Sequence, residues 1–382
     1  MQDALPVGTK IAGFVLDAPL GQGGFGITYR ARSQDGAGDY AIKEYFPSDF
    51  ARRAADGIVL PRDGKEAARN FEIGRKAFLE EAFILKDLPR QPGLVRVRGA
   101  FEKLGTAYCL MDYVAGDPLD VFARLRAQSG ELPDERQLRK LIVTLCRALS
   151  AVHKTGFIHR DVKPSNIIMT ASGAPVLIDF GAARRIGQGR GLGSMLSRKY
   201  GALEQFPGLP RSRTGGQTLI EGPWTDLFAL SVVLYEWISQ SVPPPADLRA
   251  EEQARSGSDP YVPVRQMLRR NRVETVHSDT LLALIDRGCA LMPKDRPQTA
   301  LDYCRPIERM GPLPGGPSAG PTPPPLPGAS EEVAASARPR PVPHIQSDGP
   351  RSDRAKIVTM LLIILGIAIG ATLFGLIPQE KF

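Results

Sequence analysis

The chain of 382 residues is poor in cysteine, histidine and aromatic side chains. Its four cysteines, Cys109, Cys146, Cys289 and Cys304, show no C-x-x-C spacing, so we interpret them as reduced thiols in the core of a cytosolic domain. The four histidines are scattered along the chain. No zinc site is therefore expected.

The first ten residues lack an apolar run, so no signal peptide is expected there, and no internal repeat is visible. Aromatic residues make up only 7% of the chain, and no nucleic-acid-binding motif accompanies its net charge of +8. We therefore expect no nucleic-acid partner. We assign the excess of basic residues to Arg-rich loops and to the residues that flank a predicted membrane segment near the C-terminus. The 42% of hydrophobic residues suffices for a sizeable core.

The most informative stretch that is present is His-Arg-Asp-Val-Lys-Pro-Ser-Asn, residues 159–166. An Asp followed by Asn at this spacing, after His-Arg, is typical of a loop that transfers a phosphoryl group. Asp161 can accept the proton of an attacking hydroxyl, and Asn166 can reach a Mg²⁺ ion. Lys163 can neutralise charge on the transferred group.

Two further motifs flank this loop in an informative order. Asp179-Phe180-Gly181 follows the apolar run 175–178, which places a carboxylate at the end of a buried strand and predicts a metal ligand. Upstream, Tyr40-Ala41-Ile42-Lys43 indicates a strand that ends in a Lys able to pair with phosphates.

A glycine-rich segment, Gly21-Gln22-Gly23-Gly24-Phe25-Gly26, precedes that strand. Alone it is weak, because G-x-G-x-x-G also marks dinucleotide-binding folds, where it opens a helix. Here the β-rich run Ile27-Thr28-Tyr29-Arg30 follows instead. The segment therefore predicts a hairpin folded over phosphates, with Gly allowing their close approach.

With these motifs in register, residues 10–308 resemble a eukaryotic-type bacterial serine/threonine protein kinase. The resemblance implies an α+β, bilobal fold, with an antiparallel sheet and one helix in the N-lobe and a helical C-lobe. It implies ATP and Mg²⁺ in the cleft and γ-phosphoryl transfer to Ser and Thr hydroxyls of protein substrates, including the protein itself. By resemblance, Lys163 favours Ser/Thr over Tyr acceptors.

The resemblance also assigns the nucleotide site. Periodicity predicts a helix over residues 71–88, and its Glu81 is expected to pair with Lys43, with Glu80 as the alternative. Met111 would be the gatekeeper, followed by a hinge of Asp112, Tyr113 and Val114. The residues expected to contact the nucleotide are Gly21, Gln22, Gly23, Gly24, Phe25, Gly26, Thr28, Ala41, Lys43, Glu81, Met111, Asp112 and Val114.

Other residues resemble structural and regulatory positions of the family. Asp226 is expected to anchor the catalytic loop, and Arg296 to pair with Glu204 at the end of the activation segment. That segment reads Ala-Leu-Glu, residues 202–204, and lacks the usual Pro. Ser197 is expected near the peptide substrate. Ser194 lies near the usual activating phosphosite, and Arg160 could pair with a phosphate there.

Between Lys43 and Glu81 the chain is longer than this family usually needs. The turn signal Ala55-Asp56-Gly57-Ile58 predicts an inserted β-hairpin packed on the N-lobe. Lys-Glu-Tyr-x-Pro at its start resembles a bacterial subgroup of the family. A regulatory role and a stabilising role both remain open.

The C-terminal part changes in composition. Residues 309–356 are rich in Pro, Gly and Ala and predict a disordered linker, whereas residues 357–377 carry no charge and predict a transmembrane helix about 31 Å long. Basic residues precede that helix, so a single-pass protein of the inner membrane is expected, with the kinase-like domain in the cytoplasm. Residues 378–382 would form a short extracytoplasmic tail. Gly366 and Gly370 suggest a homodimer contact.

Two other functions remain open at this point. A pseudokinase scaffold would bind nucleotide without transfer, but the presence of Lys43, Asp161, Asn166 and Asp179 disfavours it. A small-molecule kinase of antibiotic-phosphotransferase type shares the Asp and Asn of the loop. It lacks an equivalent of Lys163 and an activation segment such as residues 194–204.

Overall fold

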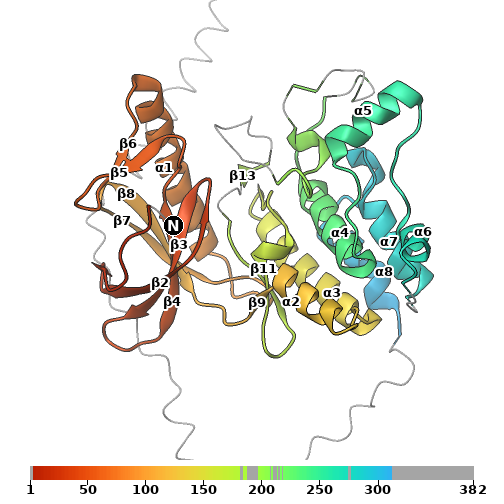
Figure 1. The fold of residues 1–382 in the computed structure, drawn as a ribbon, viewed down its shortest axis with the longest axis horizontal. Coiled ribbons are helices and arrows are strands. Elements are labelled where there is room, and N and C mark those ends of the chain that lie inside the picture. The colour runs from red at the N-terminus through yellow and green to blue at the C-terminus, as the bar shows by residue number, and fades with distance from the viewer. Residues whose placement is uncertain are drawn as a thin grey trace, which may run out of the picture. The chain divides into compact units, whose positions relative to one another are not determined.

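An antiparallel sheet with the strand order β1-β2-β3-β4-β8-β7 forms the N-terminal lobe (Figure 1). The computed structural model of the protein describes residues 3–180, 184–186, 197–206, 208–209, 213, 216, 218–273 and 277–311. Alternate side chains of β2 and β3 point into one apolar core, as the period of a half-buried strand requires. The six strands are β1 (Lys10–Ile11), β2 (Phe14–Gly23), β3 (Gly26–Ser33), β4 (Asp39–Tyr45), β7 (Val97–Lys103) and β8 (Thr106–Asp112).

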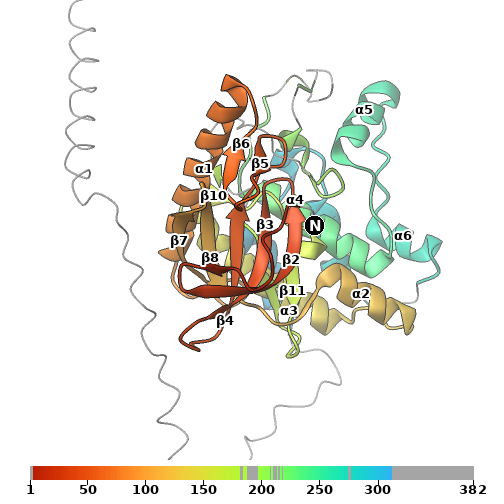
Figure 2. The ribbon, with the colours of Figure 1, turned by 60° about the vertical axis from the view of Figure 1, so that its left-hand side comes forward.

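One long helix, α1 (Lys65–Lys86), packs against β7 and β8 (Figure 2). It begins six residues before the predicted start at Phe71, after Gly64, whose φ of 110° breaks the extended chain ahead of it. Phe71 and Phe78 lie 5.5 and 5.7 Å from the ring of Tyr45, so aromatic packing fixes the helix to the end of β4.

The predicted insertion is a hairpin of β5 (Ala51–Arg53) and β6 (Val59–Pro61). Gly57 occupies its turn with a φ of 84°, a conformation that glycine adopts without steric cost. Arg53 reaches from the hairpin to the buried carboxylate of Glu44, with Nη2 to Oε2 at 2.5 Å. The prediction that the insertion packs on the N-lobe is therefore confirmed.

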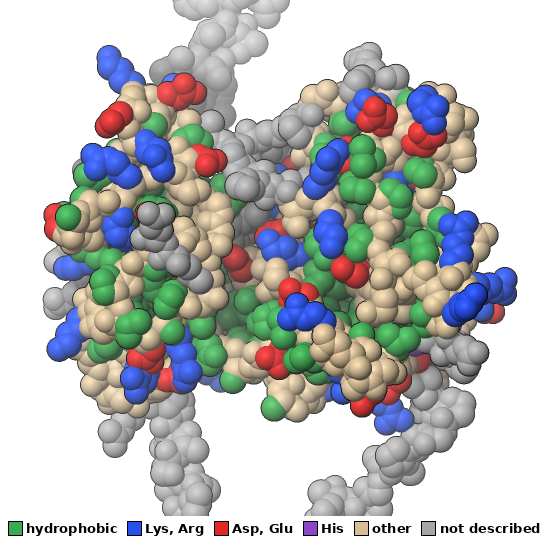
Figure 3. All heavy atoms as spheres, viewed as in Figure 1, with side chains coloured by type: hydrophobic (Ala, Val, Ile, Leu, Met, Phe, Trp, Pro, Cys, Tyr) green, Lys and Arg blue, Asp and Glu red, His purple; other side chains and the backbone are tan. Residues whose placement is uncertain are grey.

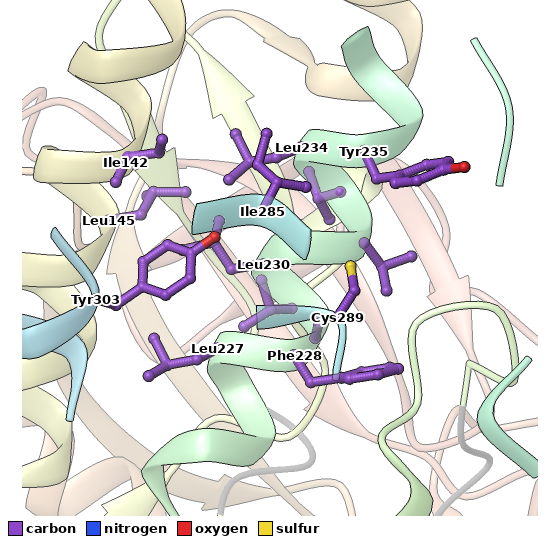
Figure 4. Close-up of a cluster of buried hydrophobic side chains, with 14 of the residues drawn as sticks. Ile142, Leu145, Leu227, Phe228, Leu230, Leu234, Tyr235, Ile285, Cys289 and Tyr303 are labelled. Atoms are coloured by element: carbon purple, nitrogen blue, oxygen red, sulfur yellow. The ribbon is translucent and has the colours of Figure 1, made fainter. Parts of the chain in front are cut away.

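The C-terminal lobe is helical and centres on α4 (Pro223–Ser239), whose side chains are buried around almost its whole circumference. Figure 4 shows Leu227, Phe228, Leu230 and Leu234 of this helix packed among residues of its neighbours. The surrounding helices are α2 (Leu119–Gln128), α3 (Glu135–His153), α5 (Ala246–Ser256), α6 (Val264–Arg270), α7 (Asp279–Gly288) and α8 (Ala300–Arg309).

Short strands lie where the lobes meet and carry the loops of interest. Strand β11 (Ile167–Met169) pairs with β12 (Pro175–Leu177) on one side and with β9 (Asp117–Pro118) on the other. Strand β10 (Phe157–Ile158) pairs with β13 (Arg184–Arg185). A small apolar cluster joins α1, β8 and the C-lobe, and it includes Phe180.

The α+β, bilobal arrangement predicted from the motifs is therefore confirmed. The four cysteines are free and buried, as predicted. Among the helices of the described residues, none has the length and apolar character needed to cross a bilayer. The predicted linker beyond residue 311, the transmembrane helix over residues 357–377 and the pair Gly366 and Gly370 lie outside the described residues.

Candidate active site

The loop of residues 159–166 runs between β10 and β11, and one buried carboxylate fixes its start. Asp226 of α4 accepts hydrogen bonds from the backbone N–H groups of His159 and Arg160 at 2.8 and 2.7 Å, and it contacts His153 Nε2 at 2.8 Å. Burial opposes the charge of Asp226, but the bond to His153 and these N–H groups outweigh it and hold its pKa below the ordinary value. The prediction that Asp226 anchors the loop is confirmed.

His159 links this loop to the segment that carries Asp179. Its Nδ1 accepts from the N–H of Asp161 at 3.3 Å, and its Nε2 lies 3.3 Å from the carbonyl oxygen of Ile178. Burial lowers the pKa of His159, which favours a neutral ring with Nε2 protonated and donating to Ile178. The ring also packs on Phe180, with 4.7 Å between centroids.

Two of the predicted catalytic side chains, Lys163 and Asn166, converge on a third, Asp161. Lys163 Nζ donates to its Oδ2 at 2.6 Å, and Asn166 Nδ2 donates to Oδ2 at 3.0 Å and to its backbone carbonyl at 2.9 Å. Asp161 and Lys163 are 20% and 27% exposed, so a hydroxyl from a substrate can reach them. The arrangement gives Asp161 one oxygen that is held and one that is available to accept a proton.

Across the cleft, Lys43 on β4 forms an ion pair with Asp179, which follows β12. Lys43 is buried, which by itself disfavours its charge, but the attraction of Asp179 and, less strongly, of Glu81 holds its pKa above the ordinary value. Asp179 has a φ of 63° and a side chain that is 36% exposed. Lys43 therefore stays charged in a position to meet an anionic ligand.

Glu81 lies on α1 and lines one small cavity with Lys43, Asp179, Phe180 and Met111. Glu81, which the resemblance pairs with Lys43, thus lies beside Lys43 and its charge acts on it, and Lys43 also forms the ion pair with Asp179. Glu80, the alternative partner for Lys43, does not line this cavity. Figure 3 shows the surface hollowed between the two lobes.

The glycine-rich segment forms the predicted hairpin between β2 and β3, with Gly24 and Phe25 in its turn and Gln22 exposed. A Cβ on Gly26 would lie 2.2 Å from the carbonyl oxygen of Glu44, so this glycine is required by the close approach of β4. Around Gly21 and Gly23 the space is open, and a Cβ would meet no atom within 4 Å. These two backbones are thus accessible to a phosphate chain.

The register of the sheet shows where the other residues predicted to contact the nucleotide lie. Thr28 pairs with Gly21 on one side and Lys43 on the other, and Ala41 pairs with Met111. In the hinge, the N–H of Asp112 donates to the Arg96 carbonyl at 2.9 Å, and its carboxylate is bound by Arg98. The partly buried Val114 follows two residues later.

The side chains of Asn166 and Asp179 supply oxygen ligands that fit a divalent cation bound together with a nucleotide. The N–H of Ile178 donates to the Asn166 carbonyl oxygen at 2.8 Å, which brings Asp179 next to Asn166. The Asn166 side chain donates to Asp161 through Nδ2, which leaves its amide oxygen for a metal. A carboxylate with an amide oxygen is the kind of hard ligand pair that Mg²⁺ binds.

At the end of the activation segment, Glu204 is fully buried and pairs with Arg296 at 2.7 Å, as predicted. Thr225 of α4 also donates to it at 2.8 Å. The missing Pro is offset by Gln205, which accepts from the Ala202 N–H and donates to the Arg160 carbonyl, both at 3.0 Å. The segment is thus tied directly to the catalytic loop.

Of the two serines predicted to be functional in the activation segment, Ser197 is among the described residues and Ser194 is not. Ser197 is partly buried and its carbonyl accepts from the N–H groups of Tyr200 and Gly201, whereas Ser194 and Gly181 lie outside the described residues. Sequence reasoning missed Gln205 and Glu221, the carboxylate that pairs with Arg160. Neither residue belongs to a kinase motif of the sequence, and only the fold brings them to the catalytic loop.

Comparison with known proteins agrees with this geometry. A family model described as "Protein kinase domain" matches residues 14–305. The serine/threonine-protein kinase PknA of Nostoc is 29% identical over 76% of this chain and 46% of its own length, and PkaA of Streptomyces coelicolor is 28% identical over 76% and 48%. The chain thus spans about half of these curated relatives.

Solved structures show the same fold. The structure titled "PpkA-294 apo form" is 32% identical, covers 80% of this chain and 99% of its own, and has a TM-score of 0.63. The kinase domain of Mycobacterium tuberculosis PknI, at 21% identity and a TM-score of 0.54, supports the fold alone. The chain belongs to the protein kinase family. Membership implies use of ATP with a divalent metal.

Proposed function

We propose that the protein is a bacterial serine/threonine protein kinase that uses ATP and Mg²⁺. The observation that carries this proposal is the convergence of Lys163 and Asn166 on Asp161, opposite the pair of Lys43 and Asp179. The relatives named as serine/threonine-protein kinases support it. Lys163 beside the catalytic carboxylate supports Ser and Thr as acceptors.

In this proposal each residue has a defined task. Asp161 accepts the proton of the attacking Ser or Thr hydroxyl, and its bonds to Asn166 and Lys163 keep the carboxylate oriented toward the acceptor. Lys163 also neutralises charge on the transferred phosphoryl group, and Lys43 orients the phosphates from the opposite lobe. A divalent metal held by Asn166 and Asp179 would, when bound, shield the charge of the phosphates.

The nucleotide would lie between the glycine-rich hairpin and the hinge. The open backbones of Gly21 and Gly23 would cover its phosphates, while Ala41, Met111 and Val114 would line the position of the base. The N–H of Asp112 is already bonded to the Arg96 carbonyl, so this donor is not available to the base.

We further propose that residues 357–377 anchor the protein in the inner membrane, with the kinase domain in the cytoplasm, and that Gly366 and Gly370 support a homodimer. The support is the uncharged run, the basic residues before it and the spacing of the two glycines. A Gly366→Leu, Gly370→Leu protein that still dimerises in membranes would contradict the dimer, and recovery of the full chain in the soluble fraction would contradict the anchor.

The experiment that tests the enzymatic proposal incubates the full chain with labelled ATP, Mg²⁺ and a generic protein substrate. Label on Ser or Thr of the substrate and of the protein itself is expected, and omission of Mg²⁺ should abolish it. Bound ATP without any transfer would contradict the proposal. Mass spectrometry of the labelled protein would show whether Ser194 or Ser197 is modified.

A further inference from the structure

The guanidinium of Arg160 is buried and forms two parallel bonds with Glu221. Nε lies 2.5 Å from Oε2 and Nη2 lies 3.0 Å from Oε1. The side chain of Arg160 is 3% exposed and that of Glu221 is 19% exposed. Two-bond pairing of this kind fixes direction as well as distance, because the planar fork of Arg matches the two oxygens of a carboxylate.

Residues at the start of α4 hold the backbone on both sides of Glu221. Trp224 Nε1 donates to the carbonyl of Ile220 at 3.0 Å, and the N–H of Gly222 donates to Thr225 Oγ1 at 3.0 Å. A Cβ on Gly222 would lie 2.4 Å from the indole of Trp224, so the chain passes closely over that ring. The turn leads into α4, which is buried along most of its length and packs among its neighbours in the core of the lobe (Figure 4).

Arg160 itself needs support, because it lies immediately before Asp161 with a φ of 68°. A left-handed conformation is sterically unfavourable for a non-glycine residue. Its N–H is held by Asp226 at 2.7 Å and its carbonyl by Gln205 at 3.0 Å. Glu221 supplies the third restraint, on the side chain. A rotation of Arg160 out of this conformation would displace the carboxylate of Asp161.

We propose that Glu221 is a positioning residue: a fixed carboxylate that holds Arg160 and, through it, Asp161, so that transfer does not require a phosphate on the activation segment. This inference rests on the proposed kinase function. A phosphorylated serine would bring roughly two negative charges to a guanidinium that already has a carboxylate partner. It would therefore meet repulsion from Glu221 and add little order to the loop.

The test compares four full-length proteins: wild type, Glu221→Gln, Glu221→Asp and Glu308→Gln. Glu308 pairs with Arg147 on an exposed surface, with Arg147 59% exposed, and is the matched control for loss of a carboxylate. Each protein is treated with phosphatase and then assayed on a protein substrate with Mg²⁺, over times too short for autophosphorylation. Both kcat and the KM for ATP are measured.

Dephosphorylated wild type and Glu308→Gln are expected to retain at least about half of the untreated kcat. Glu221→Gln should lose at least about tenfold in kcat while its KM for ATP changes less than about threefold, because the ATP site is not touched. Glu221→Asp restores the charge with a shorter side chain and should lie between them. A merely structural role would lower the melting temperature without this split between kcat and KM.

Two results would overturn the inference: a dephosphorylated wild type that loses most of its activity, or Glu221→Gln with wild-type kcat. If Glu221→Gln does not fold, Glu221→Asp decides, since a reduced kcat supports the role and an unchanged kcat contradicts it. Absence of transfer in every protein would instead contradict the proposed function on which the inference depends.

Discussion

The catalytic loop and the glycine-rich hairpin lie on opposite sides of one cleft and are held in different ways. The loop is fixed by buried side chains, among them Asp226 of α4 and Gln205, and the pair of Glu204 and Arg296 next to Gln205 is bonded to Thr225 of α4. The hairpin is held by backbone pairing and has open space around Gly21 and Gly23. We infer that the catalytic loop is a fixed frame, whereas the glycine-rich hairpin can adapt to a bound nucleotide.

The same contrast applies to charge. In the C-lobe, Arg296 is buried with its partner Glu204, and neither is exposed. In the N-lobe, Lys43 is buried, but its partner Asp179 is 36% exposed. We therefore expect substitutions in the C-lobe frame to lower stability first, and substitutions at the N-lobe pair to lower activity first.

The largest effect is expected from Arg296→Met, which leaves Glu204 as a buried carboxylate without its cation. Loss of one partner of a buried pair typically costs about 3–5 kcal/mol. The free energy of unfolding from chemical denaturation should fall by that amount, with activity lost in parallel. The matched control is Arg147→Met at an exposed pair, and equal stability of the two variants would remove the contrast.

Lys43→Ala should affect activity more than stability. Removal of a charge that stabilises the phosphates should lower kcat by at least about a hundredfold, the scale of one electrostatic donor. Because the partly exposed Asp179 can be solvated, the unfolding free energy should fall less than in Arg296→Met. Wild-type turnover of Lys43→Ala would contradict the assignment of Lys43.

Arg53→Met tests the inserted hairpin, which is joined to the N-lobe by the buried ion pair of Arg53 and Glu44. Among the ion pairs of the described residues, this is the buried pair of the N-lobe that does not face the cleft. Glu44 would lose its cation but keep bonds from the hydroxyls of Tyr29 and Tyr108 at 2.8 and 2.6 Å. We expect a loss of about 2 kcal/mol, the scale of a hydrogen bond to a charged group. An unchanged KM for ATP would assign the insertion to stability; a large rise in KM would indicate a role in nucleotide binding.

A smaller effect should follow from pH. Burial lowers the pKa of His159 and of His277, so both resist protonation in the folded state. In the unfolded chain they bind protons below about pH 6.5, and stability should therefore decline as the pH falls from 7 toward 5. His277→Gln should reduce this slope, as measured by denaturation at each pH, and a slope equal to that of wild type would contradict the contribution of His277.

The two-lobed fold was predicted through the resemblance to protein kinases that the motifs carry, whereas some single elements could be predicted from their own residue patterns. The buried run 175–178 placed Asp179, and the turn signal at Gly57 located the inserted hairpin. The start of α1 was predicted too late, since Lys65 and its neighbours have no apolar face to reveal a helix. Glu221 and Gln205 could not be found, because their partners are distant in sequence and only tertiary packing brings them together.

The measurement that tests the central claim most directly compares ATP binding and phosphoryl transfer in the full-length wild type and Asp161→Asn. The variant keeps the size of the side chain but loses the carboxylate that accepts the proton. If Asp161 is the base, ATP affinity should stay nearly unchanged while transfer falls at least about a hundredfold, and Asp49→Asn on the exposed surface should match wild type. Near-normal transfer by Asp161→Asn would contradict the account.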